Sequence, residues 1–256
     1  MRFTKIIHFL FYWTSVLLLC SCSKSKNSNP TVDIKTGLVA YFPFNGDAKD
    51  SSGNGNDGTV LGAALTTDRF GNPNSAYEFF GENFGNVKTR IFTENSASLN
   101  ILGDLTLSAW VNSKGFGINV GGFYQTIIAR RDPSIDTYEM GLYLDDPLNS
   151  SFSIIGGRIY SGGSQESITS ILIGDFNKWH HLTYTIKSNQ VSFYMDGILI
   201  QLRDKTSYNL VALNCNCGVV IGSTIEGLQH FAGDLDEVRI YNRALNQSEI
   251  SYLASH

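Results

Sequence analysis

The sequence predicts an all-β domain, a sandwich or a barrel, with one short helix near the C-terminal end. Three observations support this prediction. The 25 glycines, 16 phenylalanines and 12 tyrosines fit short aromatic strands separated by tight turns. Roughly a dozen segments alternate apolar and polar residues between Gly, Pro, Asp and Asn. A helical pattern occurs in a single short segment, so the helix is an addition to a β fold.

The expected strands follow one another along most of the chain. Pro43 marks a strand end or a sheet edge, because proline cannot donate to a ladder of hydrogen bonds. The pair Asp196-Gly197 favours a tight hairpin. The segments expected as strands are 37–44, 76–80, 87–92, 105–111, 125–131, 138–144, 152–160, 167–173, 179–186, 190–195, 198–203, 219–222 and the stretch that begins at 233.

The expected helix spans residues 246–253. Asn246 is a suitable N-cap, and Glu249 stands three residues later, as a capping box requires. This segment is therefore predicted to begin at a defined residue.

The stretch 233–245 is the last expected strand and contains an unusual charge. Strict alternation places Asp236 with Val238 and Ile240 on one apolar face. A buried unpaired carboxylate is costly, so Asp236 needs a cation or several hydrogen bonds. Glu237 and Arg239 are expected on the opposite face as a surface ion pair worth little energy.

The N-terminal segment resembles a secretory signal of the lipoprotein type. Basic residues precede an apolar run of about 14 residues, short for a membrane span of roughly 20. The run ends in Leu-Cys-Ser-Cys, which favours cleavage before Cys22 and lipidation of that cysteine. We therefore expect a signal peptide over residues 1–21 and a polar, lipidated tether over 22–36, with an ordinary secreted protein as the alternative. The expected location is the bacterial cell envelope, anchored to the outer membrane and facing either the periplasm or the exterior.

The charge balance excludes a nucleic-acid partner. The net charge is −4, and removal of two cations with residues 1–21 gives −4 − 2 = −6. A mildly acidic chain without a basic run does not favour nucleic acid. The remaining residues are enough for one large β domain over residues 37–256.

Several motifs resemble, in order, the laminin-G-like jelly-roll family of the concanavalin A-like lectin and glucanase superfamily. The resemblance covers residues 37–254 and implies a two-sheet antiparallel jelly-roll sandwich. It does not imply one ligand, because such domains bind sugars or proteins. The segments that carry it are Gly37 to Gly46 with Asp50 to Gly58, Leu107 to Val111, Trp179 to Thr183, Tyr194 to Gly197 and Gly233 to Leu245.

The loop over residues 45–58 is rich in oxygen donors, as a calcium site requires. An EF-hand register from Asp50 fails, because its twelfth position is Leu61 rather than Glu. The alternative is a turn-rich loop whose Asp and Asn side chains bond their own backbone. The family resemblance implies a structural Ca²⁺ that joins this loop to the last strand, with Asp47, Asp50 and Asp236 as ligands.

No pattern of catalytic residues appears, so we expect no enzymatic activity. Glucanase relatives place two carboxylates on one strand as Glu-x-Asp-x-x-Glu, and this sequence has no such run. His180 and His181 are adjacent on an expected strand, so they point to opposite faces. No nucleophile elbow or phosphate loop is present.

We therefore expect a carbohydrate-binding envelope lipoprotein, with a protein-interaction or adhesion module as the alternative and a divergent glycoside hydrolase as a weaker one. Phe116, Phe123 and Tyr124 lie in a glycine-rich stretch and are candidates for stacking on sugars, or else fold back onto the sandwich. Cys215 and Cys217 are a possible disulfide, with two free thiols or a kinked turn as the alternatives. The expected partners are a glycan or an envelope or extracellular protein, and the membrane through the lipid anchor.

Overall fold

The computed structural model describes most of the chain after residue 31. The described ranges are 32–81, 88–101, 103–115, 124–132, 135–143, 153–161, 164–173, 176–204, 217–224 and 229–256, with the backbone alone for residue 124 and for 131–175. The predicted signal peptide and Cys22 lie outside these ranges. In the described part of the chain, no helix has the length and hydropathy that a membrane crossing requires.

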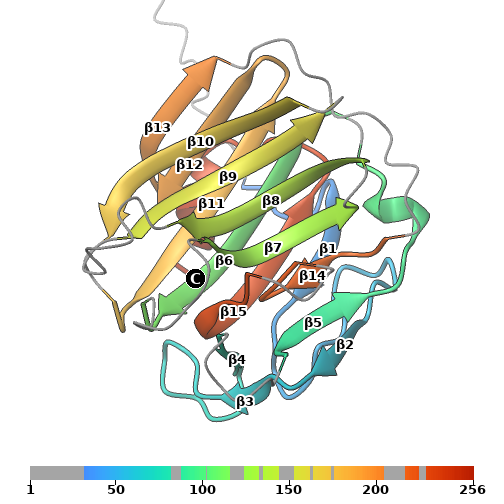
Figure 1. Ribbon diagram of the computed structural model, residues 1–256, viewed down its shortest axis with the longest axis vertical. Helices are drawn as coiled ribbons and strands as arrows, with labels where there is room; N and C mark the ends of the chain where they lie inside the picture. Colours follow the sequence, from blue (N-terminus) through green and yellow to red (C-terminus); the bar gives the residue numbers. More distant parts are fainter. Residues whose placement is uncertain are drawn as a thin grey trace, which may run out of the picture. The chain divides into compact units, whose positions relative to one another are not determined.

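In the described ranges, fifteen strands form two antiparallel sheets (Figure 1). In chain order they are β1 (Leu38–Phe42), β2 (Gly58–Leu61), β3 (Ala64–Thr66), β4 (Ala76–Phe80), β5 (Arg90–Thr93), β6 (Leu105–Ser113), β7 (Tyr124–Asp132), β8 (Ile135–Tyr143), β9 (Ser153–Ser161), β10 (Ser164–Ile173), β11 (Trp179–Lys187), β12 (Gln190–Met195), β13 (Ile198–Asp204), β14 (Val220–Ile221) and β15 (Ala232–Tyr241). A 3₁₀ turn η1 (Ala97–Leu99) and helix α1 (Gln247–Leu253) complete the described elements.

The two sheets face each other across a shared core (Figure 1). The first has the order β13-β12-β11-β6-β15-β4-β3, and β1 also pairs with β15. The second has the order β10-β9-β8-β7-β14-β5-β2. Apolar residues from both sheets fill the space between them, among them Phe42, Leu107 and Ile128. The predicted all-β sandwich is confirmed.

Helix α1 begins where the sequence predicts. The Asn246 side chain accepts hydrogen bonds from the backbone N–H groups of Ser248 and Glu249 at 2.9 and 3.1 Å. Glu249 in turn accepts from the backbone N–H of Asn246 at 2.7 Å, which completes the capping box. The apolar side of the helix packs with Tyr241 in a second cluster, separate from the main core.

Strand β15 contains a β-bulge that the alternation pattern did not predict. Its pairing with β6 shifts between Asp236 and Arg239, and Glu237 has a φ of 55°. Leu235 and Val238, three residues apart, therefore both face the core. The prediction that Asp236 shares the face of Val238 is wrong, because the extra residue in the bulge turns Asp236 to the outer face.

The domain also begins earlier than the predicted boundary at Gly37. The compact unit starts at Val32, so the last residues assigned to the tether belong to the domain. Hydrogen bonds from Tyr241 and Arg243 hold these residues against the end of β15.

Candidate functional site

A cavity lies where the first strand, the oxygen-rich loop and the last strand meet. It has a volume of about 380 Å³, within the range of small-molecule sites. We call it the first-strand cavity. Its lining residues are Ile34, Lys35, Leu38, Tyr41, Ser51, Ser52 and Arg239.

One wall is a turn formed by residues 33–36. The Asp33 carboxylate accepts hydrogen bonds from the backbone N–H groups of Lys35 and Thr36, both at 3.0 Å. Hydrogen bonding, above all from Thr36, lowers the pKa of Asp33 to about 2. The turn therefore has a defined shape before any ligand binds.

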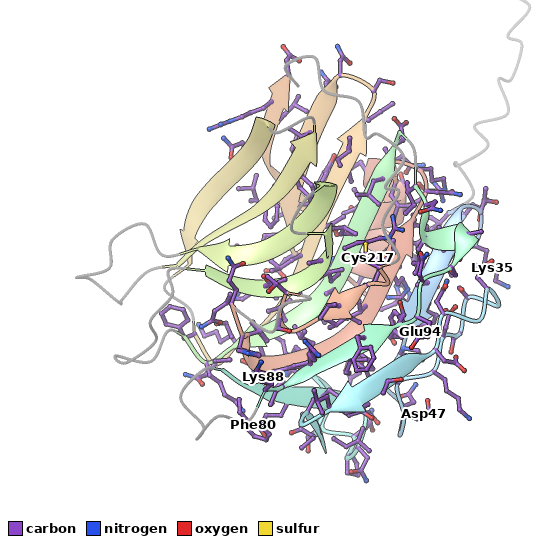
Figure 2. The ribbon with its side chains drawn as sticks, turned by 45° about the vertical axis from the view of Figure 1, so that its right-hand side comes forward. Lys35, Asp47, Phe80, Lys88, Glu94 and Cys217 are labelled. Atoms are coloured by element: carbon purple, nitrogen blue, oxygen red, sulfur yellow. The ribbon has the colours of Figure 1, made fainter. Side chains whose placement is uncertain are left out.

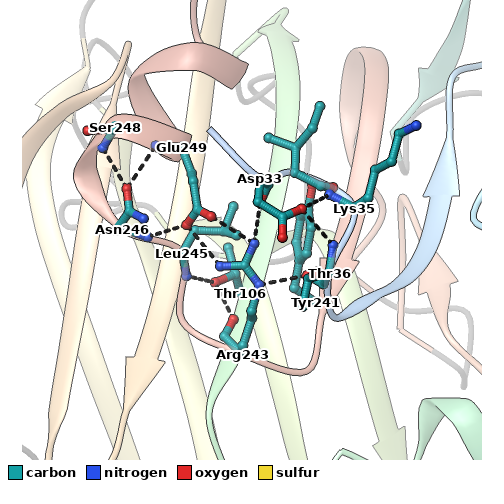
Figure 3. A network of polar contacts seen from close by, with 11 residues as sticks. Asp33, Lys35, Thr36, Thr106, Tyr241, Arg243, Leu245, Asn246, Ser248 and Glu249 are labelled. Atoms are coloured by element: carbon teal, nitrogen blue, oxygen red, sulfur yellow. Dashed lines mark hydrogen bonds and ion pairs between the residues drawn. The ribbon is translucent and has the colours of Figure 1, made fainter. Parts of the chain in front are cut away.

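Arg243 attaches this turn to the end of the domain (Figure 3). Its guanidinium donates to the carbonyl oxygens of Asp33 and Thr36, the latter at 2.6 Å. The same group pairs with both carboxylate oxygens of Glu249 in α1 at 2.9 Å. Tyr241 adds a hydrogen bond from its hydroxyl to the carbonyl of Ile34 at 3.1 Å. One arginine thus joins the wall of the cavity to the helix.

The opposite wall comes from the oxygen-rich loop, which Asp50 organises. One Asp50 oxygen accepts from the backbone N–H groups of Tyr41 and Ser52 at 3.0 and 2.8 Å. The other accepts from the backbone of Asn56 at 2.9 Å and from the Ser52 hydroxyl at 2.8 Å. The backbone N–H of Ser51 donates to the Tyr41 carbonyl at 2.7 Å, which places Ser51 beside β1.

Tyr41 and Arg239 form the third side of the cavity. The Arg239 guanidinium lies 4.0 Å from the centre of the Tyr41 ring and pairs with Glu237. The Tyr41 hydroxyl donates to the Glu237 carboxylate at 2.9 Å, and burial raises the pKa of Tyr41. The expected ion pair forms, but its predicted exposure at the surface is wrong, because Arg239 is only 8% exposed. The bulge turns Glu237 towards Tyr41 and Arg239 instead of leaving it in open solvent.

Asp236 has a counter-ion that the sequence analysis missed. It is 2% exposed, and its Oδ2 lies 2.6 Å from Nη1 of Arg69 in the loop between β3 and β4. The guanidinium also lies 4.2 Å from the ring centre of Phe70 and 4.7 Å from that of Trp110. Burial raises the pKa of Asp236 to about 7, although Arg69 acts in the opposite direction. A basic residue between two aromatic contacts leaves no periodic signal in the sequence.

The three predicted calcium ligands have different surroundings. The Asp47 side chain is 55% exposed at the rim of the domain, and it accepts from the backbone N–H of Lys49 at 3.0 Å (Figure 2). Asp50 is engaged within its loop, and Asp236 with Arg69. Among the described residues, no group of three or more His, Cys, Asp or Glu is close enough to hold a metal. Calcium binding through these residues stays a prediction.

The predicted aromatic rim lies largely outside the described residues. Phe116 and Phe123 are not among them, and Tyr124 begins β7, where its backbone pairs with Tyr143. Cys217 is disulfide-bonded, while Cys215 lies outside the described part. The Cys215–Cys217 pairing therefore stays a prediction.

The adjacent histidines have separate partners. His180 Nδ1 lies 2.9 Å from the Asp196 carboxylate. His181 is buried, and its Nε2 lies 2.9 Å from the Ser108 hydroxyl. Burial lowers the pKa of His181 to about 3, so the ring is neutral at physiological pH. Both contacts connect elements of the first sheet.

Comparisons with known proteins agree with this fold. The family model described as the concanavalin A-like lectin/glucanases superfamily matches residues 84–251. Domain 4 of an extracellular arabinanase from Geobacillus stearothermophilus, solved with arabinotriose, is 20% identical, with a TM-score of 0.64 over 85% of this chain and 98% of that domain. The binding domain of Paraclostridial Mosquitocidal Protein 1 is 21% identical, with a TM-score of 0.66 over 87% of this chain and 52% of that one.

Among curated proteins, the chain is similar to a small part of much longer relatives. Adhesion G-protein coupled receptor V1 of Danio rerio is 26% identical over 159 residues, which is 60% of this chain and 2% of the receptor. Human usherin is 29% identical over 96 residues, which is 34% of this chain and 2% of usherin. Each match therefore covers one short segment of the relative.

Proposed function

Because the chain belongs to the concanavalin A-like lectin/glucanases superfamily, we propose that it is a non-catalytic carbohydrate-binding module whose ligand occupies the first-strand cavity. In the wider proposal, the module is lipid-anchored through Cys22 in the bacterial cell envelope and contains a structural calcium. The family resemblance identified from the sequence motifs is correct, and the proposal adds a place for the ligand.

The observation that carries the proposal is the mixed lining of the cavity. Ile34, Leu38 and the Tyr41 ring offer apolar surface to the C–H face of a sugar ring. Ser51 offers a hydroxyl, for which the described residues provide no hydrogen-bond partner. A few polar groups on an apolar, preformed cavity are typical of small-molecule sites.

The lining also favours binding over hydrolysis. A retaining glycosidase needs two carboxyl groups about 5–5.5 Å apart across the scissile bond. Among the described residues that line the first-strand cavity, none is Asp or Glu. The arabinanase domain that was solved with arabinotriose is a fold neighbour, and its complex supports a sugar ligand for this chain.

A second candidate function is a protein-interaction or adhesion module. Strand β13 ends the order of the first sheet, and its Ile198 and Leu202 side chains are 66% and 50% exposed. Exposed apolar residues on a terminal strand are a common feature of surfaces that bind another protein. This candidate uses a different part of the domain, so the two functions are separable.

A glycan array with the full chain in detergent tests the first proposal. The variant Ser51→Phe fills the cavity from an exposed position, and we expect it to lose at least tenfold in glycan affinity while it remains folded. Thr59→Phe, on exposed strand β2, is the matched control and should bind normally. Binding of no polysaccharide by the wild type, or unchanged binding by Ser51→Phe, contradicts the proposal and favours the β13 surface.

A further inference from the structure

The charges around the first-strand cavity indicate what kind of sugar it takes. We infer that the ligand is an acidic saccharide, a sugar ring that carries a carboxylate, and that Lys35 binds this carboxylate. The inference rests on the proposed function and adds the chemical class of the ligand.

The cavity differs in charge from the rest of the chain. Two cations, Lys35 and Arg239, line it together with neutral residues, whereas the whole chain has 23 acidic and 19 basic residues. Two cationic side chains and no acidic one among the described lining residues favour an anionic ligand over a cationic one.

Of the two cations, Lys35 is the one available to a ligand. Arg239 donates through Nη1 to the Glu237 carbonyl at 3.3 Å and pairs through Nη2 with the Glu237 carboxylate. Its charge is therefore balanced within the protein. In the described part of the chain, the Lys35 ammonium has no carboxylate within ion-pair distance, and its side chain belongs to an exposed residue.

The backbone of Lys35 is held in place, whereas the ammonium group at the end of its side chain can move. Its N–H is bonded to Asp33, and Arg243 holds the carbonyl groups on either side of it. The four-carbon side chain can then move its ammonium over the mouth of the cavity. A carboxylate at the edge of a sugar ring would meet this group while the ring contacts Leu38 and Tyr41.

Arg239 has a different part in this arrangement. Glu237 pairs with Arg239 and also accepts a hydrogen bond from the Tyr41 hydroxyl, so the guanidinium forms a rigid wall against the Tyr41 ring. This wall fixes the orientation of the aromatic surface on which a sugar ring rests. The pair thus contributes shape, and Lys35 contributes charge selectivity.

Matched pairs of sugars test the inference by calorimetry on the full chain in detergent. The probes are lactose against sialyllactose, and galactan oligomers against oligogalacturonates. For at least one pair we expect the acidic member to bind about tenfold more tightly at low salt, and the preference to shrink at high salt. Lys35→Gln should remove the preference, because it lowers the affinity for the acidic member of the pair more than the affinity for the neutral member.

Lys49→Gln is the control, because Lys49 is an exposed lysine that does not line the cavity. If the wild type binds neutral and acidic sugars equally, or if Lys35→Gln keeps the preference, the inference is wrong while carbohydrate binding stands. If no sugar in the array or in the matched pairs binds, both proposals fail. If Lys49→Gln removes the preference as well, a general surface charge and not Lys35 is responsible.

Discussion

Two arginine–carboxylate pairs lie at the bulge in β15, and their surroundings differ. Asp236 pairs with Arg69, whose side chain is held between Phe70 and Trp110. Glu237 pairs with Arg239 beside Tyr41, at the edge of the first-strand cavity. We call the surroundings of Asp236 and Arg69 the closed region, and those of Glu237 and Arg239 beside the cavity the open region. Two neighbouring residues of one strand therefore belong to different regions.

Asp236 carries a structural charge, whereas the charge of Glu237 lies near the proposed ligand. In the closed region, Asp236 depends on Arg69 for its ionised form, and one of its oxygens is buried without a hydrogen-bond partner among the described residues. In the open region, Glu237 receives both the Tyr41 hydroxyl and Arg239. Loss of the cation should therefore cost more on the Asp236 side.

Replacement of the two arginines tests this difference most strongly. Arg69→Met should lower the free energy of unfolding by about 3–5 kcal/mol, because it leaves a buried carboxylate without its cation. Arg239→Met is the matched control and should cost less, since Glu237 keeps the Tyr41 hydroxyl. Urea denaturation measures both, and the double variant Arg69→Met/Asp236→Leu should recover much of the loss. Equal costs for the two single variants would remove the distinction between the regions.

Arg243 holds the turn that forms one wall of the cavity in the open region, and its loss should have the next largest effect on stability. Arg243→Ala removes charge-assisted hydrogen bonds to Thr36, Asp33 and Glu249, at a cost of about 1.5–3 kcal/mol. Because the turn that carries Lys35 is released, glycan affinity should fall as well. Thermal melting and calorimetry on one sample measure the two effects. Lower stability with unchanged affinity would mean that the turn does not shape the cavity.

The dependence of stability on pH tests the Asp236 side of the comparison by a smaller effect. Asp236 has a folded pKa of about 7 against a usual 3.8, so the folded state keeps its proton longer and this group adds stability as pH falls from about 7 to 4. His181 has a folded pKa of about 3 against 6.5, so the unfolded state is protonated first and this group removes stability as pH falls from 6.5. The two contributions to stability therefore oppose each other between about pH 6.5 and 4.

Asp236→Asn should therefore lose stability more steeply than the wild type between about pH 6.5 and 4, because the His181 contribution then acts alone. Denaturation curves at several pH values provide the measurement. Asp47→Asn, at an exposed carboxylate, should follow the wild-type slope. A slope for Asp236→Asn no steeper than that of the wild type would show that Asp236 does not bind its proton differently in the folded state.

The sequence predicted the fold better than the site, for physical reasons. Twelve of the expected strands, the final strand and the capped helix depend on alternation and capping, which local residues determine, as at Asn246. Strands β2 and β3 were missed because they are short, and their exposed residues give no buried face to recognise. The bulge at Glu237 was missed because strict alternation cannot indicate an extra residue.

The polar partners could not be read from the sequence, because they join distant residues. Arg69 reaches Asp236 across 167 positions, and Arg243 reaches Asp33 across 210. Predicting that Asp236 required a partner was possible from the cost of burying its charge. Predicting which residue supplies it required the arrangement of β15 beside the loop that follows β3.

The Arg243 contacts also have a mechanical consequence. Tension applied to the chain at Val32 would enter the domain at the turn that Arg243 holds, and would pass to α1 before it could peel β1 from β15. The wall of the first-strand cavity would be the first part to yield. A sugar bound between Lys35 and Ser51 would then resist the pull, so that occupancy could be measured as a rise in unfolding force.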